Sequence, residues 1–373
     1  LSENVRIRET GLEDGRVPAD ADLLLVLAPE ALDEKQLFAI DQFLMQGGSV
    51  VLASSAFDAR VGETLTAYRH DSGLEDWLRH HGLDIDDSMV LDPQNAALPV
   101  PIQRDVGGLA IREIRMLPYP HFPDIRGDGL NAGNPITAGL GQLTLNWASP
   151  ITVDETNNQK RSVTSLLSSS SQSWVSSDLN IVPDYRKWPD SGFQPSDERG
   201  SRLLAVAVEG QFESFFKGKD SPLVKTPETI TDRDNRSAED AADLSADSAT
   251  TGAITGVIER SPESARIILI ASNNFADDAV LSLASRGLGI LYTQPVEFLQ
   301  NAIDWSFEDR GLLAIRSRAQ FARTLAPMER SEQLFWEYLN YALGLLGLVV
   351  VWFWRHRTRR SEQLRYQSIL VEV

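Results

Sequence analysis

Residues 22–53 read DLLLVLAPEALDEKQLFAIDQFLMQGGSVVLA. Two short, continuous apolar runs, at 22–28 and 49–53, are typical of strands that are buried on both faces of a parallel sheet. Between them apolar residues recur at helical spacing, with Asp33 as a suitable N-cap and Gly47-Gly48 as a stop. A strand, a helix and a second strand within about 35 residues predict a right-handed βαβ unit of a parallel sheet.

The chain beyond this unit continues to alternate strands and helices. Residues 92–135 are rich in proline and glycine, so we expect a long ordered loop there, with one strand at 110–117. The fold class is therefore predicted to be α/β, with a mostly parallel sheet and helices on both faces. Further strands are predicted at 88–91, 162–167, 202–208 and 265–271, and further helices at 74–81, 278–285 and 295–305.

A long apolar segment near the C-terminus predicts a transmembrane helix at residues 334–354. No charged residue occurs in 338–354, which spans about 25 Å as a helix, and residues 334–337 lengthen it to an adequate span. Aromatic residues crowd both ends, and four arginines follow within the next six residues. A buried helix of a soluble domain rarely ends in this way. Because positive residues stay on the cytoplasmic side, we expect the tail 355–373 to be cytoplasmic and the bulk of the chain extracytoplasmic.

Composition excludes several classes of site. The formal net charge is −18; the tail 355–373 holds five arginines and two glutamates, a net +3, so the rest carries −21. A surface this acidic argues against nucleic-acid binding, which needs basic groups to neutralise phosphates. The chain has no cysteine, which excludes disulfides, thiolate zinc sites and cysteine nucleophiles.

The chain starts at Leu1 with neither Met nor an apolar leader, so we expect a processed, trimmed or partial version of a longer polypeptide. Whether a membrane segment or fused permease precedes Leu1 stays open.

Changes in composition divide the chain. Between residues 217 and 250 no aromatic occurs and acids outnumber bases eight to five, so little apolar surface can offset ordering entropy. Whether the later strands extend the first sheet or form a second domain stays open. The expected parts are an extracytoplasmic sheet domain (1–150), its continuation (151–216), a flexible acidic insertion (217–250), a C-terminal α/β portion (251–310), a linker (311–333), the transmembrane helix (334–354) and a basic tail (355–373).

Polar side chains follow the strands of the expected parallel sheet, at the edge where ligands bind in open α/β sheets. They can bind a ligand or simply cap the next helix, and the absence of a phosphate loop or glycine fingerprint favours capping. The candidate ligand-binding residues are Glu30, Ser54, Ser55, Asp58, Asn273 and Asn274.

We predict no catalytic residue, metal site or cofactor. The adjacent His80 and His81 point in different directions on a helix, unlike an i, i+4 metal-binding pair. No G-x-S-x-G elbow is present, and the acids at 84–87 lack the spacing of a calcium loop.

Short motifs in a fixed order resemble a known family over nearly the whole chain. The motifs resemble those of the GldG-like auxiliary, substrate-binding components of ABC-2-type transport systems, typified by gliding motility. The resemblance implies a flavodoxin-like sheet, related to that of class I glutamine amidotransferases, whose nucleophilic cysteine this chain lacks. The motifs lie at 21–29, at 40–43 (IDQF), 47–52 (GGSVVL), 134–137 (NPIT), 148–151 (ASPI), 168–174 (SSSSQSW), 205–216 (AVAVEGQFESFF), 301–305 (NAIDW) and 312–318 (LLAIRSR).

This resemblance implies a non-enzymatic subunit in a bacterial inner membrane, with a periplasmic body that binds an envelope substrate or a partner. Its expected partners are an ABC-2-type permease and a separate ABC ATPase, because the chain has no nucleotide-binding motif. We expect the C-terminal helix to lie in the lipid bilayer and to contact the permease through Glu337, Tyr341, Gly344 and Gly347. The two glycines are three apart rather than four, so lipid-exposed glycines are an equal alternative.

Two other functions stay open at this point. A membrane-tethered envelope hydrolase would need convergent carboxylates, for which Asp58, Glu63 and Asp277 are the candidates. A structural scaffold of an envelope complex would use the acidic body and the insertion at 217–250. The sequence leaves open the transported substrate, the direction of transport, the stoichiometry and any part in gliding.

Overall fold

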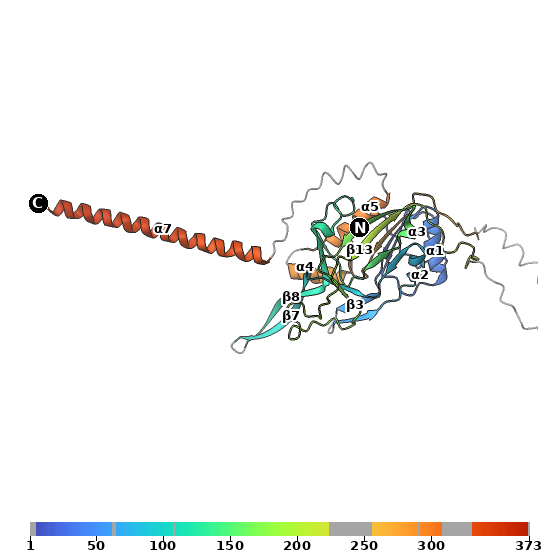
Figure 1. Ribbon diagram of the computed structural model, residues 1–373, viewed down its shortest axis with the longest axis horizontal. Helices are drawn as coiled ribbons and strands as arrows, with labels where there is room; N and C mark the ends of the chain where they lie inside the picture. The colour runs from blue at the N-terminus through green and yellow to red at the C-terminus, as the bar shows by residue number, and fades with distance from the viewer. Residues whose placement is uncertain are drawn as a thin grey trace, which may run out of the picture. The chain divides into compact units, whose positions relative to one another are not determined.

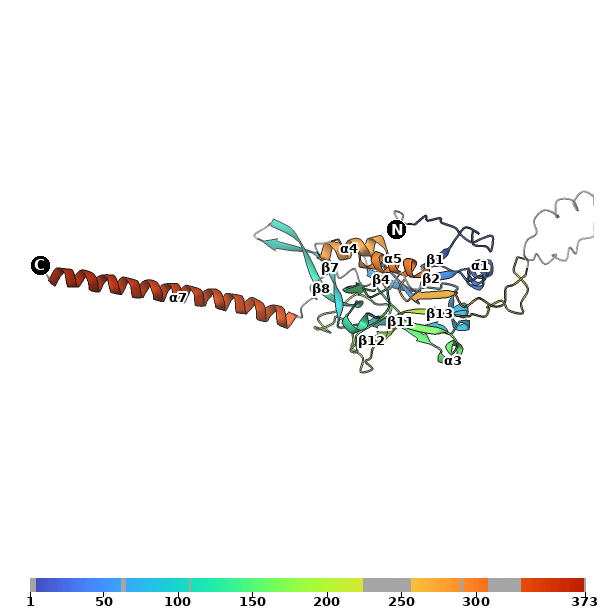
Figure 2. The ribbon, with the colours of Figure 1, turned by 90° about the horizontal axis from the view of Figure 1, so that it is seen from above.

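The computed structural model describes residues 5–61, 65–106, 109–223, 256–288, 291–307 and 330–371. The chain divides into two units, Leu1–Ala322 and Arg323–Val373, and each is described by itself. The first is an α/β body (Figures 1 and 2). The second contains one long helix, α7 (Arg330–Val371). Most of the expected insertion at 217–250 and all of the expected linker except its last four residues lie outside the described residues.

A five-stranded sheet forms the centre of the body. Its first three strands are parallel, but β13 runs antiparallel to both of its neighbours, so the sheet is mixed rather than mostly parallel. Buried strands have continuous apolar runs whether they are parallel or antiparallel to their neighbours. The sequence pattern therefore does not show in which direction a strand runs. The strand order is β1 (Leu23–Leu27), β2 (Ser49–Ala53), β14 (Arg266–Ile270), β13 (Leu203–Glu209) and β11 (Ser162–Ser168).

The predicted βαβ unit is confirmed. Helix α1 (Glu34–Met45) connects the parallel strands β1 and β2. Asp33 caps it, since its carboxylate accepts a hydrogen bond from the Gln36 N–H and the Gln36 side chain accepts one from the Asp33 N–H. Gly47, with φ of +94°, ends the helix in a conformation that favours glycine.

Helices cover both faces of the sheet, as predicted. Helices α1 and α2 (Glu75–His80) pack with alternate residues of β2, β14 and β13, among them Val50 and Leu52. The intervening residues, such as Val51, pack on the other face against α5 (Gln294–Phe307) and the segment 130–148. This alternation gives the body two apolar layers that share one sheet.

Smaller elements surround the sheet. Helix α4 (Asp278–Leu288) follows β14, and the short helices α3 (Glu155–Asn158) and η1 (Gly127–Gly129) lie in connections. The two-stranded sheets are β3 (Phe57–Val61) with β4 (Leu65–Arg69), β5 (Leu83–Ile85) with β10 (Ile151–Val153), and β6 (Met89–Leu91) with β12 (Trp174–Ser176).

The loop expected at 92–135 is instead mostly a long antiparallel hairpin. Strand β7 (Asn95–Val106) pairs with β8 (Leu109–Arg126), and the end of β8 pairs with β9 (Gln142–Thr144). The prolines that suggested a loop are tolerated because a two-stranded ribbon has free edges, where a missing N–H costs no ladder bond.

Helix α7 carries the predicted apolar segment. Its residues Leu334–Arg357 have a mean hydropathy of 1.6, none of the window is buried, and the segment is long and apolar enough to cross a membrane. It is the one such segment among the described residues.

Candidate functional site

The carboxyl ends of the three parallel strands meet at one edge of the sheet. The Ala28 N–H donates to the Ala53 carbonyl at 2.8 Å, and the Ser54 N–H donates to the Ile270 carbonyl at 3.0 Å. These bonds hold the loops after β1, β2 and β14 side by side, as the sequence predicted for a parallel arrangement.

A cavity of about 450 Å³ opens at this edge, beside the end of β2. Ser54 and Ser55 line it from the loop after β2, Arg69 and His70 line it from the end of β4, and α2 adds further side chains. Ser54 and Ser55 are 1% and 2% exposed, whereas Arg69 is exposed to solvent. The cavity therefore has buried hydroxyl-bearing residues on one side and charged groups at its mouth.

Ser55 is held by several hydrogen bonds. Its hydroxyl lies 3.1 Å from the Trp147 carbonyl and 3.0 Å from the Ser149 hydroxyl. Its N–H donates to the Asn273 side-chain oxygen at 3.0 Å. No histidine or carboxylate accepts from this hydroxyl among the described residues, so Ser55 lacks the base that would activate a serine nucleophile.

Of the other predicted binding residues, some hold neighbouring loops through hydrogen bonds and one is exposed to solvent. The Asn273 amide donates to the carbonyls of Ser55 and Phe57, at 3.0 and 2.9 Å, and so fixes the loop after β2. Asp58 accepts hydrogen bonds from the Ala59 N–H and the Tyr68 hydroxyl. Glu30 is exposed, and the buried Asn274 side-chain oxygen has no partner among the described residues. None of these four residues lines the cavity.

Charged groups at the mouth of the cavity form pairs. Arg69 pairs with Asp87, and the Arg79 Nε donates to the Asp84 carboxylate at 3.1 Å. His70 Nε2 lies 2.7 Å from the Pro29 carbonyl, which ties β4 to the loop after β1. Sequence reasoning missed this set because β4, α2 and β5 contribute it and none of them belongs to the central sheet.

Two of the three carboxylates suggested for a hydrolase, Asp58 and Asp277, accept hydrogen bonds from neighbouring groups of the chain. Of the carboxylates suggested for a hydrolase, Asp277 caps α4 through the Ala279 N–H at 2.7 Å, and Glu63 lies outside the described residues. Within the described parts of the chain no cluster of three or more His, Asp or Glu side chains could hold a metal ion. Paired charges and hydroxyls suit a polar ligand or a partner's side chains.

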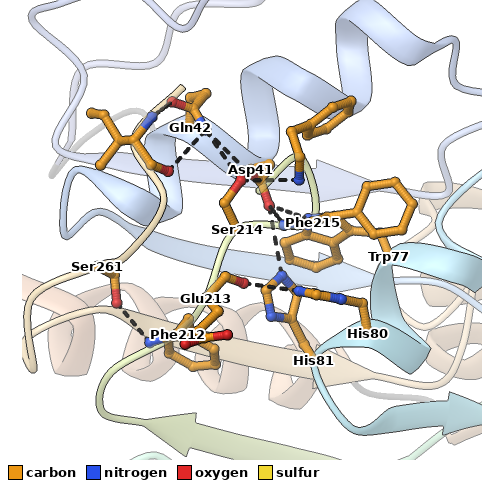
Figure 3. A network of polar contacts seen from close by, with 12 residues as sticks. Asp41, Gln42, Trp77, His80, His81, Phe212, Glu213, Ser214, Phe215 and Ser261 are labelled. Carbon is orange, nitrogen blue, oxygen red and sulfur yellow. Dashed lines mark hydrogen bonds and ion pairs between the residues drawn. The ribbon is translucent and has the colours of Figure 1, made fainter. Parts of the chain in front are cut away.

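A buried polar network centred on Asp41 of α1 includes Trp77 of α2 (Figure 3). Asp41 is 0% exposed. Its carboxylate accepts hydrogen bonds from the Ser214 hydroxyl at 2.6 Å, the Phe215 N–H at 3.0 Å and the Trp77 indole N–H at 3.1 Å. Burial alone would raise the pKa of Asp41, but the nearby His81 and the hydrogen bonds from Ser214 and Phe215 hold it below the usual value.

His81 completes this network as a neutral ring. It is 1% exposed, and its Nε2 lies 3.8 Å from Asp41 Oδ1, too far for a hydrogen bond. Burial lowers the pKa of His81 to about 4, although the carboxylate beside it acts in the opposite direction. The rings of Trp77 and Phe212 pack edge-on against it, with centroids 4.3 and 5.5 Å away.

The network fixes the two chain segments that flank the undescribed stretch 224–255. Gln42 accepts from the Ile258 N–H at 2.7 Å and donates to the Ile258 carbonyl at 3.3 Å. The Ser214 N–H donates to the Glu259 carbonyl at 2.9 Å, and the Ser261 N–H donates to the Phe212 carbonyl at 2.9 Å. The sequence contains an indication of this network, because Asp41 is a charged residue on the apolar stripe of a helix. A charge in that position needs buried hydrogen-bonding partners.

The four residues predicted to contact a permease lie on α7. The Tyr341 hydroxyl donates to the Glu337 carboxylate at 3.0 Å, one helical turn away. A Cβ added at Gly344 or Gly347 would meet nothing within 4 Å, so both glycines leave open space on the helix surface.

Comparison with known proteins relates the chain to transport systems. A family model, ABC_transp_aux, described as "ABC-type uncharacterized transport system", matches residues 1–302. A protein of Borreliella burgdorferi that is itself named "Uncharacterized protein" is 21% identical over 230 residues. That match covers 60% of this chain and 42% of the relative, so the chain spans less than half the length of the curated relative it matches. Among solved structures, the mmIFT52 N-terminal domain is similar with a TM-score of 0.40 and 11% identity, over 83% of this chain and 88% of that one.

Proposed function

The chain belongs to the ABC_transp_aux family of ABC-type transport systems, and on that premise we propose that it is a non-catalytic accessory subunit of an ABC-2-type transporter. In this proposal α7 anchors it in a bacterial inner membrane beside the permease, and the body binds a substrate or partner on the periplasmic side. A separate ABC ATPase supplies the hydrolysis. The motifs at 40–52 and 205–216 support the finer assignment to the GldG-like branch, including its flavodoxin-like sheet and its association with gliding motility.

The exposed apolar surface of α7 carries the anchoring part of the proposal. Leu348 and Trp352 are 73% and 63% exposed, and such a surface is stable only against lipid or another apolar helix. The Tyr341–Glu337 hydrogen bond satisfies a carboxylate at the outer end of this segment. A permease helix that offers a donor there would hold α7 in a fixed register.

Purification from native membranes tests the partnership. We expect the tagged full-length chain to recover a multi-span permease and an ATPase, and Glu337→Leu to reduce that recovery. Leu348→Ile, which keeps an apolar side chain at an exposed position of the same helix, is the matched control. Recovery of the chain alone, in mild detergent and after crosslinking, would contradict the proposal.

The cavity beside β2 is the proposed binding site of the body. Ser54 is almost fully buried yet lines the cavity, so a larger side chain there would fill it. We expect Ser54→Trp to abolish transport while recovery of the permease stays normal. Glu198→Trp at an exposed position serves as the control for an added indole. Normal transport by a folded Ser54→Trp variant would remove the cavity from the proposal.

A further inference from the structure

The cavity beside β2 is lined by more acidic than basic side chains. Its volume of about 450 Å³ lies within the range of roughly 300–1,000 Å³ that is typical of small-molecule sites. Four carboxylates and two guanidinium groups line it, which gives a formal net charge of −2 with the histidine counted as neutral. The acids are Asp71, Glu75, Asp84 and Asp87, and the bases are Arg69 and Arg79.

Both arginines of the cavity are already paired with carboxylates. Arg69 pairs with Asp87. Arg79 Nε donates to Asp84 at 3.1 Å, and its Nη1 donates to Asp76 at 2.6 Å. An anionic ligand would have to compete with these carboxylates for the two guanidinium groups, so the cavity is poorly suited to an anion.

The other two acids, Asp71 and Glu75, have no basic partner within the part of the chain that the structure describes. Asp71 Oδ1 accepts a hydrogen bond from the Gly73 N–H at 3.1 Å. Glu75 Oε1 accepts from the N–H and the hydroxyl of Ser72, at 3.0 and 2.8 Å. These donors are neutral, so they satisfy one oxygen of each carboxylate without compensating its charge. A cation in the cavity would compensate both charges.

The Ser54 side chain provides a second, independent indication of a ligand. Side chains alternate along a strand, and Val50 and Leu52 of β2 pack toward α1 and α2. Ser54, two positions further along, therefore faces the side on which α2 lines the cavity. Ser54 is 1% exposed, and its hydroxyl has no hydrogen-bond partner among the described residues. A polar group bound in the cavity would supply the missing partner.

Ser55 differs from Ser54 in this respect. Its side chain lies on the opposite face of the sheet, where the hydroxyl contacts the Trp147 carbonyl and the Ser149 hydroxyl. The hydroxyl available to a ligand is therefore that of Ser54.

We propose that the cavity binds a small polar molecule that carries an ammonium group. Asp71 and Glu75 compensate its charge, and the Ser54 hydroxyl forms a hydrogen bond with the same molecule. An ammonium group only donates hydrogen bonds, which suits carboxylate oxygens, and the net charge of −21 outside the basic tail attracts a cation over longer distances. This inference rests on the proposed function, in which the cavity is the binding site of the body.

Three sugars that share one ring shape but differ in charge test the proposal. At about pH 6.5 glucosamine carries an ammonium group, glucose is neutral and glucuronate carries a carboxylate. Equilibrium dialysis of each radiolabelled sugar against the full-length chain in detergent measures its affinity. We expect glucosamine to bind at least about fivefold more tightly than glucose, and glucuronate to bind most weakly, since one partly exposed ion pair changes affinity by about that factor.

Two conservative variants remove charge while keeping the hydrogen bonds of the chain. Glu75→Gln and Asp71→Asn each keep the side-chain oxygen that accepts from Ser72 or Gly73. Each should weaken glucosamine binding by about fivefold and leave glucose binding unchanged. Glu198→Gln removes one negative charge at an exposed position outside the cavity, so it is the matched control and should have no effect.

The outcomes separate this inference from the proposed function. Failure of glucosamine to bind, or equal effects of Glu75→Gln and Glu198→Gln, overturns the ammonium assignment. Tighter binding of glucose or glucuronate that Ser54→Trp abolishes also overturns it, but keeps the cavity as a binding site. The transport assay of Ser54→Trp decides separately whether the cavity is used at all.

Discussion

Asp41 is a carboxylate without access to water, and it accepts hydrogen bonds from two parts of the chain outside its own helix. Ser214 and Phe215 belong to the segment after β13, and Trp77 belongs to α2. Removing the acceptor would leave these donors buried and unpaired, each at a cost of about 1–3 kcal/mol. The residue therefore connects α1 to α2 and to the segment 212–216.

Replacing Asp41 by Leu should lower the free energy of unfolding by about 3 kcal/mol or more, because buried hydrogen-bonding partners are left without an acceptor. Urea unfolding of the full-length chain in detergent, followed by tryptophan fluorescence, measures the change. Asp76→Leu is the control: this carboxylate pairs with Arg79 at the surface, with 81% of its side chain exposed, so only about 0–1 kcal/mol should be lost. Equal effects of the two substitutions would show that the network contributes nothing beyond a surface pair.

A second prediction at the residue scale concerns pH. His121 is 1% exposed and packs against Tyr119 and Phe193, and burial lowers its pKa to about 3. His121 binds a proton near pH 6.5 in the unfolded chain but not in the folded chain. The free energy of unfolding is therefore highest above pH 6.5 and decreases as pH falls toward 3. His121→Phe should flatten this dependence in urea unfolding at pH 4 to 7. An unchanged slope would contradict the burial of a neutral ring.

Asp124 should produce the opposite trend. Burial raises its pKa to about 6, despite Arg126 with its Nε 3.6 Å from the carboxylate. Because the unfolded carboxyl ionises near pH 3.8, the folded state loses stability as pH rises from about 4 to 6. Asp124→Asn should therefore stabilise the protein at pH 7 and leave it nearly unchanged below pH 4. A loss of stability at pH 7 would show that the ionised form is favoured in the folded protein.

At the scale of elements, helix α1 shows how far local sequence determines structure. Asp33 and Gln36 make a reciprocal pair of hydrogen bonds at its start, and Gly48 leaves room for the Phe43 ring, which a Cβ would approach to 2.4 Å. Asp33→Ala should cost about 1 kcal/mol in the free energy of unfolding through loss of the cap. Glu34→Ala, one position further, is the control and should cost less in the same urea measurement.

Local signals explain which elements could be predicted. Helices α1, α2, α4 and α5 and the five strands of the sheet occur close to where apolar spacing and caps placed them. The direction of β13 was not predictable, because buried strands have the same apolar pattern in either direction. The β7–β8 ribbon was missed because its prolines indicate a loop unless the strands have free edges.

The candidate site forms only in the folded molecule, because residues far apart in the sequence line it. Strand ends predicted Ser54 and Ser55, which line the cavity. No local sequence pattern predicted that Arg69 and Arg79 line the same cavity. Strand β4 and helix α2 reach that edge of the sheet only through tertiary packing. The Asp41 network shows the same limit: the charge on the apolar stripe of α1 signals a buried partner but does not identify Ser214.

The sidedness of the chain is the last prediction, and it follows from charge. Four arginines within residues 355–360 should keep the tail cytoplasmic and the body on the opposite side. A membrane-impermeant maleimide should label Glu198→Cys in intact spheroplasts, and it should label Ser361→Cys only after the membrane is permeabilised. Replacing the four arginines by asparagine should give mixed labelling, because the orienting charge is then lost. Labelling of Ser361→Cys in intact spheroplasts would place the body in the cytoplasm and would rule out a periplasmic binding role for the cavity.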